Sequence, residues 1–85
     1  MNEHAFSDNL KKILKKIHKK DKGTYEAIMS KIQEIVSSPD LGHYKNLRYN
    51  MKDSKRVHIG HFVLIFQVKG KEIYFDDFDH HDNVY

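Results

Sequence analysis

The densest group of chemically active side chains lies near the end of the sequence, where two histidines stand among carboxylates: Asp76, Asp77, Asp79, His80, His81 and Asp82. Imidazole and carboxylate groups packed this closely can ligate a transition metal. On a strand, however, the neighbouring His80 and His81 point to opposite faces, so that one ion cannot bind both. The sequence therefore predicts no metal site, and a solvated acidic end is the alternative to a role for the histidines.

A second group of candidate residues lies on a predicted strand over residues 55–59. Arg56 and His58 share one face of this strand, because side chains alternate along it. Lys55 shares the other face with two apolar residues that suit the core. We therefore expect Arg56 and His58 to stand together on the open side of a sheet, although an ordinary polar face of an edge strand remains the alternative.

Two further cations, Arg48 and Lys52, precede this strand. They can converge with Arg56 and His58 on one concave surface. An arginine can clamp a phosphate with two hydrogen bonds and can also stack on bases. The basic stretch therefore favours a phosphate-bearing ligand.

Two amphipathic helices are predicted ahead of these residues. Ser7 is a suitable N-cap for the first helix, and Gly23 is available to end it with a left-handed residue. Thr24 can cap the second helix, which Pro39 stops. The apolar residues recur at helical spacing in both segments: Leu10, Ile13, Leu14 and Ile17, then Tyr25, Ile28, Met29, Ile32, Ile35 and Val36. Each stripe must be buried against another element.

The second half of the chain supplies that element as strands over residues 55–59, 62–68 and 72–78. Residues 62–68 are β-branched and aromatic enough for a central strand, and Lys69-Gly70-Lys71 is a hairpin turn. The predicted fold is α+β, with an antiparallel helical hairpin on one face of a small antiparallel sheet. The predicted sheet has three strands. It has four if residues 1–6, a short segment that looks unlike a strand, form an additional edge strand.

Length and composition restrict the classes of protein. Eighty-five residues are enough for one domain, residues 1–85, and the absence of cysteine excludes disulfides, a thiolate nucleophile and cysteine-bound metals. No apolar run approaches the roughly 20 residues of a membrane helix, which favours a cytoplasmic protein. Residues 1–24 hold seven lysines against three acidic residues, whereas residues 72–85 hold five acidic residues and no lysine or arginine. A basic body favours phosphate-bearing partners.

The order of these elements, together with four segments, resembles the RelE/ParE toxin superfamily, and most closely its RelE-type toxins. The segments are Leu47-Arg48, Lys55–Gly60, His61–Val68 and the terminal His80–Tyr85. The resemblance covers nearly the whole chain and implies a single RelE-like domain. In that family an arginine commonly stands where this chain has Val63, so the phosphate clamp is expected at Arg56 or Arg48.

The resemblance implies the toxin of a type II toxin–antitoxin system: a metal-independent endoribonuclease, or mRNA interferase, that binds the ribosome, cuts mRNA in the decoding site and inhibits translation. The RNA 2′-hydroxyl attacks the adjacent phosphate, which needs a base, an acid and cations. By position, the catalytic residues are Arg56, His58, His80 or His81, and Tyr85, and the RNA-binding residues are Arg48, Lys52 and Lys55. No cofactor is implied.

The implied partners are the ribosome, mRNA and a RelB-like antitoxin in a heteromeric complex. We expect the antitoxin segment that silences a basic surface to be rich in acidic and apolar residues. Two alternatives remain. One is a ParE-like toxin that inhibits DNA gyrase, and the other is a non-catalytic module that binds nucleic acid or protein, because a fold does not fix a function.

Overall fold

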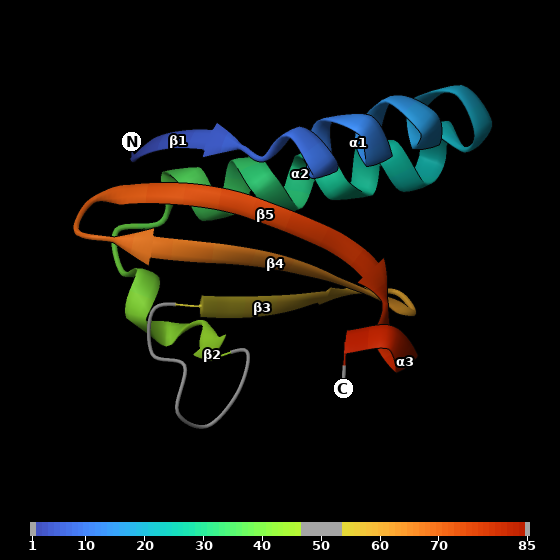
Figure 1. Cartoon of the computed structure of the whole chain (residues 1–85). Helices are drawn as coiled ribbons and strands as arrows, with labels where there is room; N and C mark the ends of the chain where they lie inside the picture. Colours follow the sequence, from blue (N-terminus) through green and yellow to red (C-terminus); the bar gives the residue numbers. More distant parts are fainter. Residues whose placement is uncertain (1, 47–53, 85) are drawn as a thin grey trace.

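The computed structural model describes residues 2–46 and 54–84, and its elements are shown in Figure 1. In chain order they are β1 (Glu3–Phe6), α1 (Asp8–Lys20), α2 (Lys22–Ser37), a 3-10 turn (Leu41–His43), β2 (Lys45–Asn46), β3 (Ser54–Ile59), β4 (Phe62–Lys69), β5 (Glu72–His80) and α3 (His81–Val84). Helices α1 and α2 lie together on one side of the sheet, so the predicted α+β fold with a helical hairpin is confirmed.

The helical hairpin follows the apolar spacing closely but differs at the connection. The predicted turn at Gly23 and cap at Thr24 are wrong, since α2 already begins at Lys22. Asp21 separates the two helices, and its carboxylate accepts hydrogen bonds from the Thr24 backbone at 3.1 Å and the Thr24 hydroxyl at 2.6 Å. These hydrogen bonds lower the pKa of Asp21. A carboxylate is the stronger cap here because it also complements the positive end of the helix.

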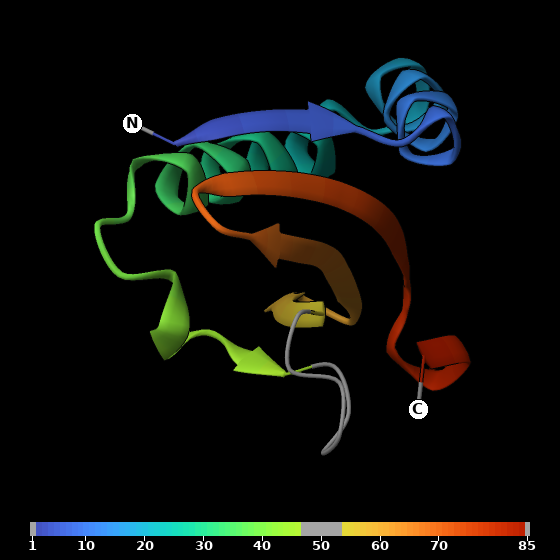
Figure 2. The same cartoon turned by 60° about the vertical axis from the view of Figure 1, so that its left-hand side comes forward.

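The sheet has five strands in the order β1-β5-β4-β3-β2, and it is mixed rather than antiparallel. The expectation that residues 1–6 are unlike a strand is wrong: β1 pairs in parallel with β5, from Glu3 opposite Glu72 to Phe6 opposite Phe75. The pairs β5·β4, β4·β3 and β3·β2 are antiparallel. Figure 2 shows how the sheet curves away from the helices toward β2 and α3.

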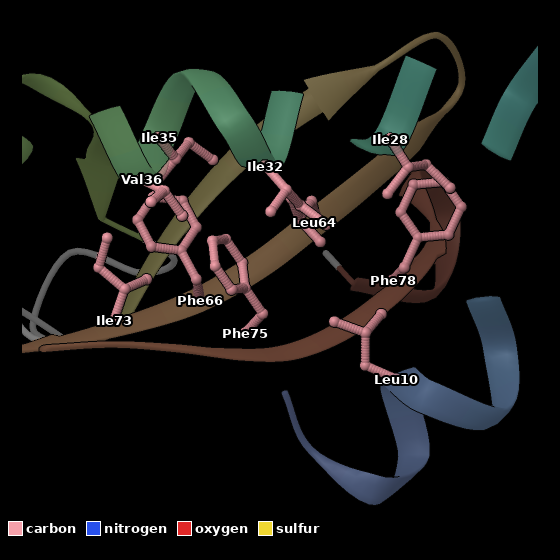
Figure 3. Packing of buried hydrophobic residues seen from close by; sticks show 10 residues of the cluster. All are labelled: Leu10, Ile28, Ile32, Ile35, Val36, Leu64, Phe66, Ile73, Phe75 and Phe78. Atoms are coloured by element: carbon pink, nitrogen blue, oxygen red, sulfur yellow. The ribbon is translucent and has the colours of Figure 1, made fainter. Parts of the chain in front are cut away.

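The hydrophobic core fills the space between the helices and one face of β4 and β5, as Figure 3 shows. Phe66 and Phe75 are fully buried with ring centroids 5.8 Å apart. The predicted stripes supply most of the rest, with Leu10 from α1 and the apolar face of α2: Ile28, Ile32, Ile35 and Val36. The opposite face of the sheet is therefore the one left for polar chemistry. None of the helices in residues 2–46 and 54–84 is long and apolar enough to cross a membrane.

The hydroxyl of Ser7 joins three parts of this fold. Its Oγ accepts a hydrogen bond from the Leu10 backbone N–H at 2.9 Å, as predicted for an N-cap, and donates to the carbonyl oxygen of Asp76 on β5. Ser7 is also buried. The same side chain therefore caps α1 and fixes that helix to the sheet.

Replacing Ser7 with alanine is expected to lower the free energy of unfolding by about 2 kcal/mol, because the helix loses its cap and a partly buried carbonyl oxygen loses its donor. Urea unfolding followed by circular dichroism measures this loss. Ser30→Ala is the matched control, since Ser30 is exposed on α2 and alanine has the higher helix propensity. Equal unfolding midpoints for the two variants would contradict the role given to Ser7.

Candidate active site

The face of the sheet that points away from the helices carries basic side chains. Arg56 lies on this face because it pairs with Ile65 on β4 and alternates with Val57, which packs against the core. His58 lies two residues further along the same strand and is exposed. The prediction that Arg56 and His58 share the open face is therefore confirmed, and the Nε atom of Arg56 is buried there.

The second histidine of this face comes from the C-terminal end. The imidazole rings of His58 and His81 lie with their centroids 5.3 Å apart and their planes inclined by 33°. His81 is the first residue of α3, and its backbone N–H donates to the carbonyl oxygen of His61 at 2.9 Å. Helix α3 contacts both β4 and β5. The turn from β5 into α3 thus carries His81 back to His58, residues far apart in the sequence.

His80 does not join this pair. It is the last residue of β5 and pairs with Phe62, so its side chain is on the side of Phe62 and the core residue Phe78. Its ring contacts Phe62, with centroids 5.5 Å apart, and stacks on His61 at 6.5 Å. The structure therefore separates the two adjacent histidines as their alternation predicts, and it is His81 that stands beside His58.

The predicted RNA-binding lysine on β3 lies on the other side. Lys55 pairs with the buried Phe66, and residues directly opposite in an antiparallel pair face the same side of a sheet. The structure therefore does not bring Lys55 to Arg56 and His58. Three other predicted site residues lie outside the described residues: Arg48, Lys52 and Tyr85.

One cation of the open face is not among the site residues predicted from the sequence. Lys45, on the two-residue strand β2, pairs with Arg56 and is exposed. A strand of two residues leaves no periodic signal in the sequence, so only its pairing with β3 reveals the position of Lys45. Arg56 and Lys45 are therefore neighbouring cations on the open face.

Val63 is the residue paired with His58, and it is fully buried.

The acidic residues near the histidines are held by hydrogen bonds. Asp79 accepts from the Asn83 side chain at 3.1 Å and from the His80 backbone N–H at 2.7 Å, and these bonds, the Asn83 one above all, lower the pKa of Asp79. Asp82 lies 3.6 Å from Nδ1 of His80 and 3.7 Å from Nδ1 of His81. Asp79 therefore holds the start of α3, and the Asp82 carboxylate lies within ion-pair distance of both imidazoles.

This arrangement suits proton transfer at a phosphate. Imidazole can serve as acid or base near neutral pH, and a guanidinium can hold two phosphate oxygens at once. Within residues 2–46 and 54–84 no group of three or more histidine, aspartate or glutamate side chains is arranged to hold a metal ion. The pair His58–His81 with Arg56 is therefore the candidate active site.

The sequence and the fold match known proteins along almost the whole chain. The sequence profile of the ParE toxin of the type II toxin–antitoxin system parDE matches residues 3–85. A candidate toxin of Methanocaldococcus jannaschii, RelE4, is 49% identical over 88 residues, which cover 100% of this chain and 92% of that protein.

Two solved structures share the fold at low sequence identity. The crystal structure of YafQ from Escherichia coli superimposes with a TM-score of 0.63 at 18% identity, covering 100% of this chain and 99% of YafQ. The E. coli DinJ–YafQ complex gives a TM-score of 0.66 at 19% identity with the same coverage. These structures confirm the arrangement of helices and sheet.

Proposed function

Because the chain belongs to the RelE/ParE superfamily of toxins from type II toxin–antitoxin systems, we propose that it is an endoribonuclease that cuts mRNA in the decoding site of the ribosome. The observation that carries this proposal is the pair of imidazoles, His58 and His81, beside Arg56 on the open face of the sheet. Cleavage of RNA needs an acid, a base and a cation at one phosphate, and these three side chains supply them.

The proposed reaction uses the RNA itself as the nucleophile. One imidazole takes the proton of the 2′-hydroxyl as the 2′-oxygen attacks the adjacent phosphorus atom. The bond from phosphorus to the 5′-oxygen of the next nucleotide breaks, and that oxygen takes a proton from the other imidazole. The products are a 2′,3′-cyclic phosphate and a free 5′-hydroxyl. Either His58 or His81 can take either role.

Fixed charge stabilises the transition state of this reaction. The phosphorane gains negative charge as the 2′-oxygen attacks, and Arg56 stands where it can hold two of the phosphate oxygens. Lys45 adds a second positive charge from β2. The proposal also includes two RNA-binding residues, Arg48 and Lys52, and one residue that positions a base, Tyr85. Lys55 lies on the face of the sheet toward the helices, so it would bind only RNA that reaches that face.

We also propose a protein partner. One of the similar folds was solved as part of a complex, that of DinJ and YafQ, and we infer that this chain binds an antitoxin. The basic helix α1 and the cations of the open face favour a partner segment with acidic and apolar residues.

A second candidate function is inhibition of DNA gyrase, which the match to the ParE toxin profile favours. The two functions predict different products. A gyrase inhibitor would leave mRNA intact and block supercoiling of relaxed plasmid DNA, whereas a ribosome-dependent nuclease would do the reverse.

The test is to add the purified protein to ribosomes stalled with a chosen codon in the decoding site and to map the ends of the mRNA. We expect one cut within that codon, with a cyclic phosphate on the upstream fragment. The matched control is the same mRNA with a 2′-deoxy nucleotide at the cut position, which lacks the attacking hydroxyl and should remain intact. Cleavage of the deoxy substrate would contradict the mechanism, and intact mRNA with blocked gyrase would favour the second candidate.

A further inference from the structure

The open face has a recess toward the opposite end of β4 from the histidine pair. It has a volume of about 250 Å³, and the side chains that line it from this face come from β1, β4 and β5: Glu3, Ala5, Gln67, Lys69, Glu72 and Tyr74. Neither the proposed reaction nor the core uses these residues. The recess therefore needs its own explanation.

Tyr74 gives this recess an unusual wall. Its side chain is 41% exposed, which makes it one of two large hydrophobic side chains so exposed in the described part of the chain. Tyr74 lies between Ala5 on β1 and Gln67 on β4. Since alanine carries only a methyl group, one flank of the phenol ring stays uncovered. An accessible aromatic ring of this kind is a platform on which a flat, apolar group can stack.

The recess and the candidate active site share one face of the sheet. Tyr74 pairs with Gln67, and Gln67 pairs with Ser54, which is two residues from Arg56 on β3. Residues paired across strands face the same way, so Tyr74 and Arg56 both face the open side. They lie two strands apart, which corresponds to about 10 Å across the sheet. A single strand of RNA held at Arg56 can therefore reach Tyr74 within a few nucleotides.

The charges of the recess suit a base better than a phosphate. Glu3 and Glu72 bring two carboxylates against the one ammonium of Lys69, so a phosphate would be repelled. Carboxylate and amide oxygens accept hydrogen bonds from the amino groups of bases, as glutamate does from cytosine and glutamine from adenine. The recess thus offers a stacking surface with hydrogen-bond acceptors at its rim.

We propose that this recess binds one nucleobase of the mRNA, with the base stacked on Tyr74 and its amino group hydrogen-bonded to Gln67 or a rim carboxylate. The inference rests on the proposed ribonuclease function. It adds a binding subsite that contributes to substrate affinity and to the choice of sequence next to the cut, while the chemistry stays at His58, His81 and Arg56.

The experiment measures kcat/KM for mRNA cleavage on programmed ribosomes. Tyr74→Ala should lower kcat/KM about five- to 150-fold, the range for loss of one stacked base. Tyr74→Phe should retain nearly all activity, because the ring remains. Tyr25→Ala is the matched control: it removes a tyrosine ring that contacts His18 in the helical layer, away from the open face.

A scan of the mRNA with single abasic nucleotides tests the contact directly. At one position near the cut, the abasic change should lower kcat/KM of the wild-type protein by the same factor as Tyr74→Ala does. The same abasic change should not lower kcat/KM of the Tyr74→Ala variant any further. If the losses of transition-state free energy from the abasic change and from Tyr74→Ala add at every position, the subsite is contradicted. Unchanged kcat/KM with weakened antitoxin binding would also contradict it, and would assign the recess to a protein partner. If the wild-type protein cuts no mRNA at all, the proposed function itself fails and the subsite fails with it.

Discussion

Replacing either His58 or His81 with glutamine is expected to lower the rate of mRNA cleavage on the ribosome about a hundredfold, the usual scale for losing a proton-transfer group. Glutamine keeps hydrogen-bonding capacity but cannot exchange a proton near neutral pH. His80→Gln, which changes the adjacent residue in the same way, is expected to keep most of the wild-type rate. The reason is geometric: the His81 ring lies 5.3 Å from that of His58, whereas the His80 ring packs on Phe62.

Single-turnover cleavage of mRNA on programmed ribosomes measures these three rates, and thermal unfolding of each variant shows that the fold is kept. The comparison between neighbours is the sharpest part of the test. A loss for His80→Gln as large as that for His81→Gln would place the chemistry on the side of the sheet that faces the helices. Full activity of both His58→Gln and His81→Gln would remove the proposed mechanism.

Replacing Phe66 with alanine is expected to cost about 3–5 kcal/mol of unfolding free energy. Phe66 is fully buried at the centre of β4, and its ring contacts those of Phe75 and Tyr44, with centroids 5.8 and 5.5 Å away. The total free energy of unfolding of a domain of this size is only about 5 kcal/mol or somewhat more. The variant should therefore be largely unfolded near body temperature and should bind an antitoxin only weakly.

Phe62→Ala is the matched control for this prediction, because it deletes the same ring from the same strand. Phe62 is 37% exposed and stacks on Phe78 from the rim of the core. Urea unfolding should show a smaller loss for Phe62→Ala, about 1–2 kcal/mol, because more than a third of this side chain stays in water in the folded protein and its removal leaves no closed cavity. Equal losses for the two variants would mean that Phe66 is not the centre of the core.

The features that the sequence determined by itself are those carried by near neighbours in the chain. The apolar stripe of α2 is set by spacing along one helix, and the shared face of Arg56 and His58 is set by alternation along one strand. The cap of α1 by Ser7 also depends only on residues three positions apart. Local geometry is enough in each case, because the residues that interact are within one element.

Only the tertiary structure decided the features that join distant segments. The short β1 becomes a strand because β5 offers it an unpaired edge, and nothing within residues 1–6 reveals that partner. That His81 rather than His80 lies beside His58 depends on the turn into α3 and on the β3–β4 hairpin. Lys45 acquires its position in the same way, from pairing with Arg56. Such contacts are fixed by the packing of the whole sheet, and spacing along the chain does not encode them.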